Sequence, residues 1–361
     1  MKAILALDLG TTGNRAIAFS KEGQILASAY YEFPQYFPQP AWVEHDPMEI
    51  WETAKKALAE VIAVVGIQNC VSLGITNQRE TTVIWNKKTG TPIYNAIVWQ
   101  CRRTSDMCEK LAEHHDMIKK KTGLFLDPYF SATKIAWILN QVDGAQDLAE
   151  SGDLLFGTID SWMTWQLTGG AQHVTDASNA SRTMLYNICD GQYDPELLSL
   201  FNIPDTLLPE VKNSQDDFGV IEASLFGLEI PISAILGDQQ AALFAQCGND
   251  QQAFKNTYGT GLFIVANTGS EIPESARLIN TVAWQIDGKR TYALEGSVFI
   301  GGSAIQWLRD QLQLINSAEE TEALALSISD NEGVYFVPAL SGLGAPHWDP
   351  NARGLLIGLT R

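Results

Sequence analysis

The sequence is poor in basic residues and has no long apolar run. Lysine and arginine number 24 against 42 aspartate and glutamate residues, which gives a formal net charge of -18. Nucleic acids and anionic membrane surfaces attract basic patches and repel acidic ones. We therefore expect no nucleic-acid partner, and any bound phosphate must meet locally placed donors. No apolar run is long enough to cross a bilayer, so no membrane insertion is expected.

Cysteine is also scarce. The five cysteines are odd in number, scattered, and without the paired spacing of a metal site. They are Cys70, Cys101, Cys108, Cys189 and Cys247. This usage is typical of a reduced compartment, and the N-terminus runs directly into an apolar strand with no export signal. The chain is therefore expected to be cytoplasmic.

Two common nucleotide-binding motifs are missing, the Walker loop and a Gly-x-Gly-x-x-Gly helix start. Residues 3–19 instead read as an apolar strand, Asp8, the turn Gly10–Gly13 and a second strand. The glycines allow unusual backbone angles, and the turn amides and two threonine hydroxyls can donate to phosphate oxygens. Asp8 can hold a magnesium ion, directly or through water, and Arg15 adds a positive charge. An ordinary hairpin explains this segment equally well when it is taken alone.

The pattern of strand, polar turn and strand occurs twice more. Residues 71–85 place a polar run between two apolar segments, and residues 256–266 place Thr-Tyr-Gly-Thr-Gly between two others. Repeated units separated by helices predict two related α/β domains that face one another across a cleft, with the polar turns lining it. We expect the domains to span residues 1–248 and 249–361, with the hinge at Gln251 and Gln252.

Helices are expected between these units. Asp46 is a candidate N-cap, Pro47 suits the first helical position, and Glu49 completes a capping box for a helix to about Val65. The run Lys119–Lys121 suits a solvated helix end before a glycine, because cations complement the helix dipole there. Further helices are expected around residues 131–140, 160–167, 237–247 and 303–314.

One polar turn carries two adjacent opposite charges. Arg79 and Glu80 lie between apolar strands, and neither charge belongs in a sheet interior without a polar partner. A polyol can supply that partner, with Arg79 donating to a hydroxyl and Glu80 accepting from one. A surface ion pair is the alternative interpretation. Trp99 can form the floor under a sugar-like backbone, or it can be ordinary core.

A carboxylate and a glycine pair begin two later helices. Asp238 follows an apolar strand, where it suits a general base acting on a hydroxyl or, alternatively, a helix N-cap. Gln239 beside it offers a second polar contact, which favours the base. Gly301 and Gly302 precede an amphipathic helix that carries Gln306, and helix N-terminal amides favour phosphate. A simple glycine-rich helix start explains that segment as well.

Together these segments resemble the FGGY family of carbohydrate kinases. Residues 129–141, Tyr-Phe-Ser-Ala-Thr-Lys-Ile-Ala-Trp-Ile-Leu-Asn-Gln, match the first signature of that family at every constrained position. Within the family, the chain is most similar to the members that phosphorylate glycerol. The segments that carry this similarity are residues 42–47, 77–82, 98–103, 175–185, 237–242, 258–263 and 337–350.

The resemblance implies an α/β fold of the actin-like, ribonuclease-H-like type, with two related domains around a cleft. It also implies transfer of a phosphoryl group from ATP to glycerol, giving sn-glycerol 3-phosphate and ADP, with Asp238 as the base and Asp8 helping to hold Mg²⁺. Closure of the two domains would exclude water. The implied glycerol contacts are Arg79, Glu80, Trp99, Tyr129, Asp238, Gln239 and Phe263. The implied nucleotide contacts are Thr11, Thr12, Gly13, Arg15, Thr260, Gly302 and Gln306.

The chain departs from the family pattern in two places. Residues 218–232 lack the Gly-Gly-Thr-Arg loop with which some bacterial members bind fructose 1,6-bisphosphate, so that control is not expected. Residues 354–361 are where the second signature of the family begins. We therefore expect an incomplete second domain with exposed apolar surface and weakened nucleotide affinity.

Two alternatives stay open at this point. One is a family member that acts on another polyol or sugar, such as xylulose or erythritol. The other is a non-catalytic module that binds a polyol without turning over ATP. Family members commonly form homodimers or homotetramers, and the sequence gives no signal that decides between these states.

Overall fold

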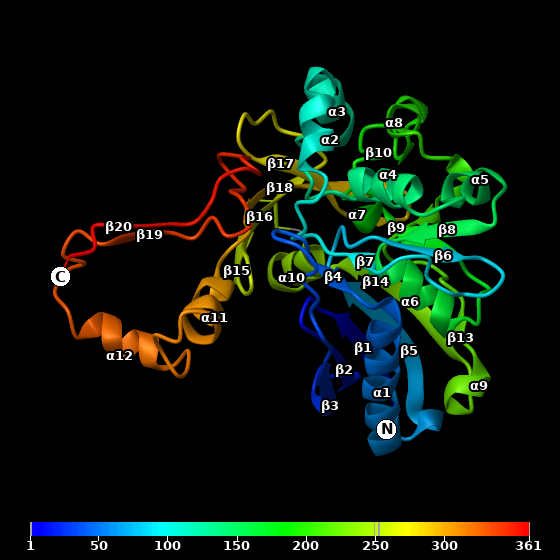
Figure 1. The fold of residues 1–361 in the computed structure, drawn as a ribbon. Helices are drawn as coiled ribbons and strands as arrows, with labels where there is room; N and C mark the ends of the chain where they lie inside the picture. Colours follow the sequence, from blue (N-terminus) through cyan, green and yellow to red (C-terminus); the bar gives the residue numbers. More distant parts are fainter. Residues whose placement is uncertain (1, 249, 252, 361) are drawn as a thin grey trace.

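The computed structural model describes residues 2–248, 250–251 and 253–360. The first lobe, residues 2–248, is built on a six-stranded sheet (Figure 1). Its strands lie in the order β13 (Val220–Ile221), β14 (Ile230–Gly237), β5 (Cys70–Asn77), β1 (Ala3–Leu9), β2 (Gly13–Ser20) and β3 (Ile25–Glu32). β1, β2 and β3 form an antiparallel meander, whereas β1, β5 and β14 run parallel to one another. The α/β class predicted for this lobe is confirmed.

Helix α1 (Pro47–Val65) covers β2 and β3 on one face of this sheet. Asp46 caps it as predicted, because its carboxylate accepts a hydrogen bond of 2.7 Å from the backbone N–H of Met48. The capping box is not formed, since Glu49 accepts a hydrogen bond of 2.9 Å from the Tyr36 hydroxyl instead. The buried face of the helix consists of Pro47, Ile50, Trp51, Ala54, Ala57, Leu58, Val61 and Ile62.

The other predicted helices are present with shifted ends. α11 (Gly302–Asp310) is shorter than the helix predicted over residues 303–314, because Gln313 has a positive φ of 53°, which an α-helix cannot contain. α3 (His115–Thr122) ends at Gly123, whose φ of 74° is the left-handed conformation expected after the lysine run. The remaining predicted helices are α4 (Ser131–Gln141), α6 (Ile159–Leu167) and α10 (Asp238–Cys247).

Smaller elements complete the first lobe. The short strands are β4 (Glu44–His45), β6 (Val83–Asn86), β7 (Ala96–Ile97), β8 (Leu154–Gly157), β9 (Val174–Asp176), β10 (Tyr186–Asn187), β11 (Gln192–Tyr193) and β12 (Glu210–Lys212). The short helices are η1 (Ile67–Asn69), α2 (Ser105–Lys110), η2 (Ala112–His114), α5 (Ala145–Glu150), α7 (Ala177–Ala180), α8 (Pro195–Phe201), η3 (Asp205–Leu207) and α9 (Ala223–Phe226).

The second predicted repeat is not a hairpin. β5 has β1 on one edge and β14 on the other, so no edge of β5 is free for the strand that follows it. β6 therefore leaves the sheet and pairs in antiparallel fashion with β8. The polar residues between β5 and β6 consequently form a link between two sheets.

The second lobe, residues 253–360, contains a four-stranded antiparallel sheet. The order is β15 (Phe254–Tyr258), β16 (Leu262–Gly269), β18 (Lys289–Val298) and β17 (Ile279–Ile286). β15 and β16 form the third predicted unit as a true hairpin, with Tyr258 opposite Leu262. Helix α10 of the first lobe packs against both of these strands. The predicted hinge includes Gln252, which lies outside the described residues, as does Asn249 at the predicted domain boundary.

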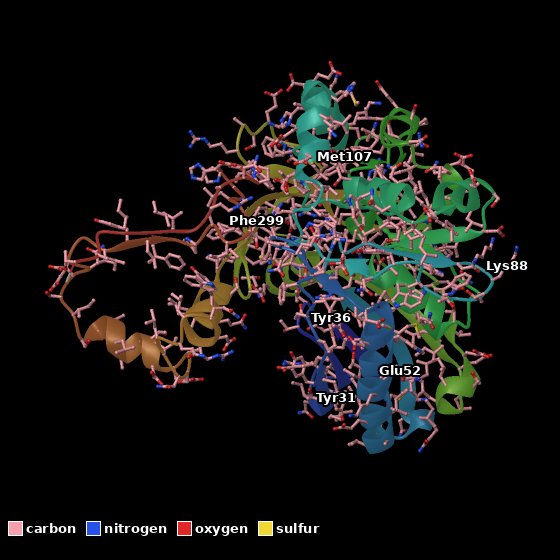
Figure 2. All side chains as sticks on the ribbon, viewed as in Figure 1. Tyr31, Tyr36, Glu52, Lys88, Met107 and Phe299 are labelled. Carbon is pink, nitrogen blue, oxygen red and sulfur yellow. The ribbon has the colours of Figure 1, made fainter. Side chains whose placement is uncertain are left out.

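An arm extends from the second lobe and consists of α11, α12 (Glu320–Leu326), β19 (Tyr335–Val337) and β20 (Leu355–Ile357). Figure 2 shows side chains crowded within the main body and standing apart along this arm. Tyr335 and Ile357 are 60% and 55% exposed, so the apolar surface expected there is present. Across the described helices, none is both long and apolar enough to span a bilayer.

Candidate active site

A cavity of about 310 Å³ opens between the two lobes, and polar turns from both lobes line it. The β1–β2 turn contributes Gly10–Thr12, the β5–β6 link contributes Gln78–Glu80, and the β15–β16 turn contributes Gly259–Gly261. The structure therefore brings together the three polar bends that the sequence singles out. Of the predicted residues, Asp8, Thr11, Thr12, Arg79, Glu80, Trp99, Tyr129, Asp238, Gln239, Thr260 and Phe263 line this cavity.

Arg79 and Glu80 are buried, being 3% and 1% exposed, so the surface ion pair is ruled out for them. Arg79 forms two hydrogen bonds of 2.6 and 3.0 Å with the carboxylate of Glu295. Arg182 donates to Glu80 at 2.6 Å and to Glu295 at 3.1 Å, which closes a four-membered charge network. Buried charges require such partners.

The network fixes the shape of the β5–β6 link. Glu80 has a φ of 61°, a conformation rarely adopted by residues other than glycine. Its carbonyl accepts hydrogen bonds of 3.0 Å from the hydroxyls of Thr82 and Ser131. Although burial opposes ionisation of Glu295, the guanidinium groups of Arg182 and Arg79 lower the pKa of that carboxyl. The ion pairs of its side chain and the hydrogen bonds to its carbonyl thus hold Glu80 at the cavity wall.

Asp238 is the first residue of α10, and Gly237 occupies the N-cap position before it. The alternative interpretation of Asp238 as the helix cap is therefore wrong. Its carboxylate accepts a hydrogen bond of 2.7 Å from the Gln239 N–H and lies 3.4 Å from the Arg79 Nε. About a third of the side chain, 35%, remains exposed to the cavity. Asp238 is thus oriented by its neighbours and still reachable by a bound hydroxyl.

Three aromatic rings form the apolar wall of the cavity. Trp99 lies 5.8 Å from Tyr129 and 5.9 Å from Phe263 between ring centroids, in edge-to-face geometry. The Trp99 indole N–H donates to the Thr11 hydroxyl at 3.0 Å. Trp99 is therefore both buried core and cavity wall, so the two interpretations do not exclude one another.

Sequence reasoning missed three charged residues of the site. Glu295 had a usable signal, because it is a carboxylate inside an apolar strand, and Arg182 falls in one of the segments that carry the family resemblance. Lys255 of β15 is buried and donates to Gln239 and to the Thr257 hydroxyl. Burial, followed by repulsion from Arg79, lowers the pKa of Lys255 to about 8.

The remaining predicted nucleotide residues lie apart from this cavity. A neighbouring cavity of about 360 Å³ is lined by Thr260, Gly302 and Gln306, and Thr260 also lines the first one. Gly13 and Arg15 line neither cavity. A Cβ at Gly13 would lie 2.7 Å from the Tyr30 ring, and the Arg15 guanidinium lies 5.2 Å from the centroid of that ring.

Asp8 is the predicted magnesium ligand, and its environment fits a cation. The surrounding protein removes water from its carboxyl and Asp238 adds repulsion, which together raise its pKa to about 6 although Arg15 opposes the shift. The described residues contain no group of three or more His, Cys, Asp or Glu placed for a metal. Mg²⁺ is commonly held by one or two carboxylates, substrate phosphates and water. The donor set thus suits a cation brought with a phosphate.

Two lobes whose strand-linking turns face a shared polar cavity define the actin-like, ribonuclease-H-like class of phosphotransferase folds. Residues 3–245 match the N-terminal domain of the FGGY family of carbohydrate kinases, and residues 254–361 match the C-terminal domain. The chain belongs to this family.

Known glycerol kinases are similar in sequence to this chain over its full length. Glycerol kinases of Aquifex aeolicus and Ligilactobacillus salivarius are 55% and 56% identical over 100% of the chain and 73% of their own length. The crystal structure of Plasmodium falciparum glycerol kinase with ADP matches with a TM-score of 0.86 at 36% identity. That match covers 100% of this chain and 73% of the Plasmodium falciparum chain. Xylulose kinase from Lactobacillus acidophilus shares the fold, with a TM-score of 0.83 at 22% identity over 100% of this chain and 73% of that one.

Proposed function

We propose that the chain phosphorylates glycerol at the expense of ATP. The observation that carries the proposal is the position of Asp238, which faces one cavity together with the polar turns of both lobes. A base for an alcohol and donors for phosphate therefore meet in one space. The similarity to glycerol kinases, about 55% over the whole chain, supports glycerol as the alcohol.

The polyol site combines charged and apolar contacts. We propose that Arg79 donates to one hydroxyl and that Glu80 accepts from its neighbour. The carbon side of the polyol packs on Trp99 and Phe263, which present rings to the cavity. Binding of this kind orients one hydroxyl, because each polar side chain is already fixed by protein partners.

Asp238 is proposed to accept the proton of the attacking hydroxyl. Its carboxylate is within reach of the cavity, and the Arg79 Nε lies 3.4 Å from one of its oxygens. Phosphoryl transfer requires alignment and neutralisation of charge more than covalent chemistry. The amides of the β1–β2 turn and Thr260 of the β15–β16 turn supply donors from opposite lobes.

Magnesium, when bound with ATP, would neutralise phosphate charge beside Asp8. The chain itself contributes fixed donors and a partly enclosed space. Gly302 begins α11, where a helix N-terminus suits an anion, and Gln306 of the same helix also lines the second cavity. We propose that the nucleotide extends from the first cavity into the second through Thr260.

A coupled assay of ADP release tests this function, with glycerol and xylulose compared as acceptors. Glycerol should support turnover, and Asp238→Asn should reduce kcat about 10²–10⁴-fold while glycerol binding remains detectable by tryptophan fluorescence. Asp143→Asn, at an exposed carboxylate outside the cavity, is the matched control.

Near-normal turnover of Asp238→Asn would remove the base from its role. Glycerol binding without turnover, in this chain and in one extended to the length of its relatives, would support a binding module instead. Faster turnover with xylulose than with glycerol would reassign the substrate.

A further inference from the structure

We propose that His45, acting through Gln35 and Gln78, holds the β1–β2 turn in the shape that presents its backbone N–H groups to phosphate. This inference rests on the proposed function and assigns a positioning residue to it. His45 belongs to residues 42–47, one of the segments that carry the family resemblance, and it is fully buried. It does not line the cavity, so it acts on the substrate only through other groups.

His45 lies between two glutamine side chains. Its Nε2 is 2.6 Å from the Gln35 Oε1, and its Nδ1 is 3.4 Å from the Gln78 Nε2. The Gln35 amide donates to the Thr11 carbonyl at 2.9 Å, and the Gln78 amide donates to the Gly10 carbonyl at 3.1 Å. Two consecutive carbonyls of the turn are thus captured by side chains that share one imidazole.

The hydrogen-bond pattern permits a single form of the ring. Because the Gln35 NH₂ is directed at a carbonyl, its Oε1 must accept a hydrogen bond from the His45 Nε2–H. Nδ1 must then accept from Gln78, which also directs its NH₂ toward a carbonyl. The neutral ring with the proton on Nε2 satisfies both bonds, whereas a doubly protonated ring would oppose the Gln78 NH₂. Burial lowers the pKa of His45 to about 3, in keeping with a neutral ring.

Peptide planarity transmits this arrangement to the cavity. In a trans peptide the carbonyl and the following N–H point in opposite directions. Capture of the Gly10 carbonyl therefore directs the Thr11 N–H away from Gln78, and capture of the Thr11 carbonyl does the same for the Thr12 N–H. Within the described residues, neither N–H donates to another protein group. Two oriented donors are left for an anion.

The test measures binding of magnesium tripolyphosphate and of MgADP by calorimetry, and of glycerol by tryptophan fluorescence. His45→Phe keeps a buried ring but removes both hydrogen bonds, so affinity for both phosphate probes should fall about tenfold. Glycerol affinity should stay within about twofold, because the polyol wall is untouched. His45→Gln keeps a donor near the Nε2 position and should recover part of the loss.

The matched control is His173→Phe, since His173 donates to the Phe156 carbonyl away from the cavity. It should leave all three affinities unchanged. Gln35→Leu, at a half-buried position, removes the donor to Thr11 and the acceptor for the His45 Nε2 but keeps the imidazole, so it tests the inference even where His45→Phe fails to fold. Unchanged tripolyphosphate binding by Gln35→Leu or a folded His45→Phe overturns the inference. A parent chain that binds neither phosphate probe overturns the proposed function instead.

Discussion

Arg79 and Glu80 are neighbours in sequence, yet each has its shortest ion pair with a distant residue. Arg79 lies 2.6 Å from Glu295, and Glu80 lies 2.6 Å from Arg182, whereas Arg79 and Glu80 are 3.8 Å apart. A charged side chain that is buried loses its hydration and must find fixed partners. The same partners keep Glu80 in its left-handed conformation. The residues proposed to bind the polyol are thus preorganised.

His45 gives a pH-dependent prediction at the residue scale. Its pKa is about 3 in the folded chain, against about 6.5 when unfolded, so protons bind the unfolded state first. Its contribution to the free energy of unfolding is therefore intact above pH 6.5 and declines as pH falls toward 3. The slope is at most about 1.4 kcal/mol per pH unit.

His45→Gln removes that slope. The stability difference between the parent and His45→Gln should change in favour of the variant as pH falls from 7 to 5, as measured by urea unfolding at several pH values. Other shifted groups, such as Asp160 with a pKa raised to about 7 by burial, are common to both proteins and cancel in the difference. A difference that is constant with pH would contradict the prediction.

At the element scale, the site is built from the ends of parallel strands. β1, β5 and β14 are parallel neighbours, and their registers place Asp8 beside Thr76 and Gly237 beside Asn77. The carboxyl ends of such strands meet at one edge of the sheet. β5 is followed by Gln78–Glu80 and β14 by Asp238, so the topology brings the proposed polyol residues, Arg79 and Glu80, close to the proposed base.

Gly237 gives a prediction at this scale. A Cβ at this position would lie 2.9 Å from the Arg79 Cγ and Cδ, which are confined by the bonds to Glu295. Gly237→Ala should therefore displace Arg79 and raise the KM for glycerol about tenfold or more, as measured by steady-state kinetics.

Gly74→Ala is the control in the adjacent strand. Its Cβ would meet only the Ala234 Cβ, at 4.0 Å, which is an ordinary contact. Its KM for glycerol should equal that of the parent. If Gly237→Ala also has the KM for glycerol of the parent, the prediction is wrong and the position of Arg79 does not control glycerol binding.

At the scale of the whole molecule, buried charges join the two lobes. Glu295 of β18 pairs with Arg79 and Arg182 of the first lobe, and Lys255 of β15 donates to Gln239 of α10. Each contact lies beside the cavity, so the position of one lobe on the other determines the shape of the site. If one lobe moves relative to the other, it must either keep these contacts or separate buried charges that water does not reach.

Glu295→Gln should destabilise the whole chain. The amide keeps the shape of the side chain but leaves two buried guanidinium groups without their shared carboxylate. We expect the free energy of unfolding to fall by about 3–5 kcal/mol, as measured by urea denaturation. Asp310→Asn, which breaks an exposed pair with Arg309, should cause no measurable change. Equal stability of both variants and the parent would contradict a structural role for the network.

Elements that depend on local signals could be predicted from the sequence, whereas those that depend on distant segments could not. The β1–β2 hairpin, α1 and α4 were predicted because each depends on local signals: turn glycines, an N-cap, apolar spacing. The pairing of β6 with β8 was not predicted, because it depends on which strand edges are already occupied. The predicted capping box is absent for a similar reason, because Glu49 accepts a hydrogen bond from Tyr36, which belongs to another segment.

The sequence by itself determined the α/β class, the polar turns and, through its motifs, the FGGY family, because these depend on residues that are close together in the chain. Only the tertiary structure decided the partners of Arg79 and Glu80, the exclusion of Gly13 and Arg15 from the cavity wall, and the role proposed for His45. Burial and hydrogen bonding there join residues up to 216 positions apart, as between Arg79 and Glu295. Chain folding alone brings such groups within bonding distance.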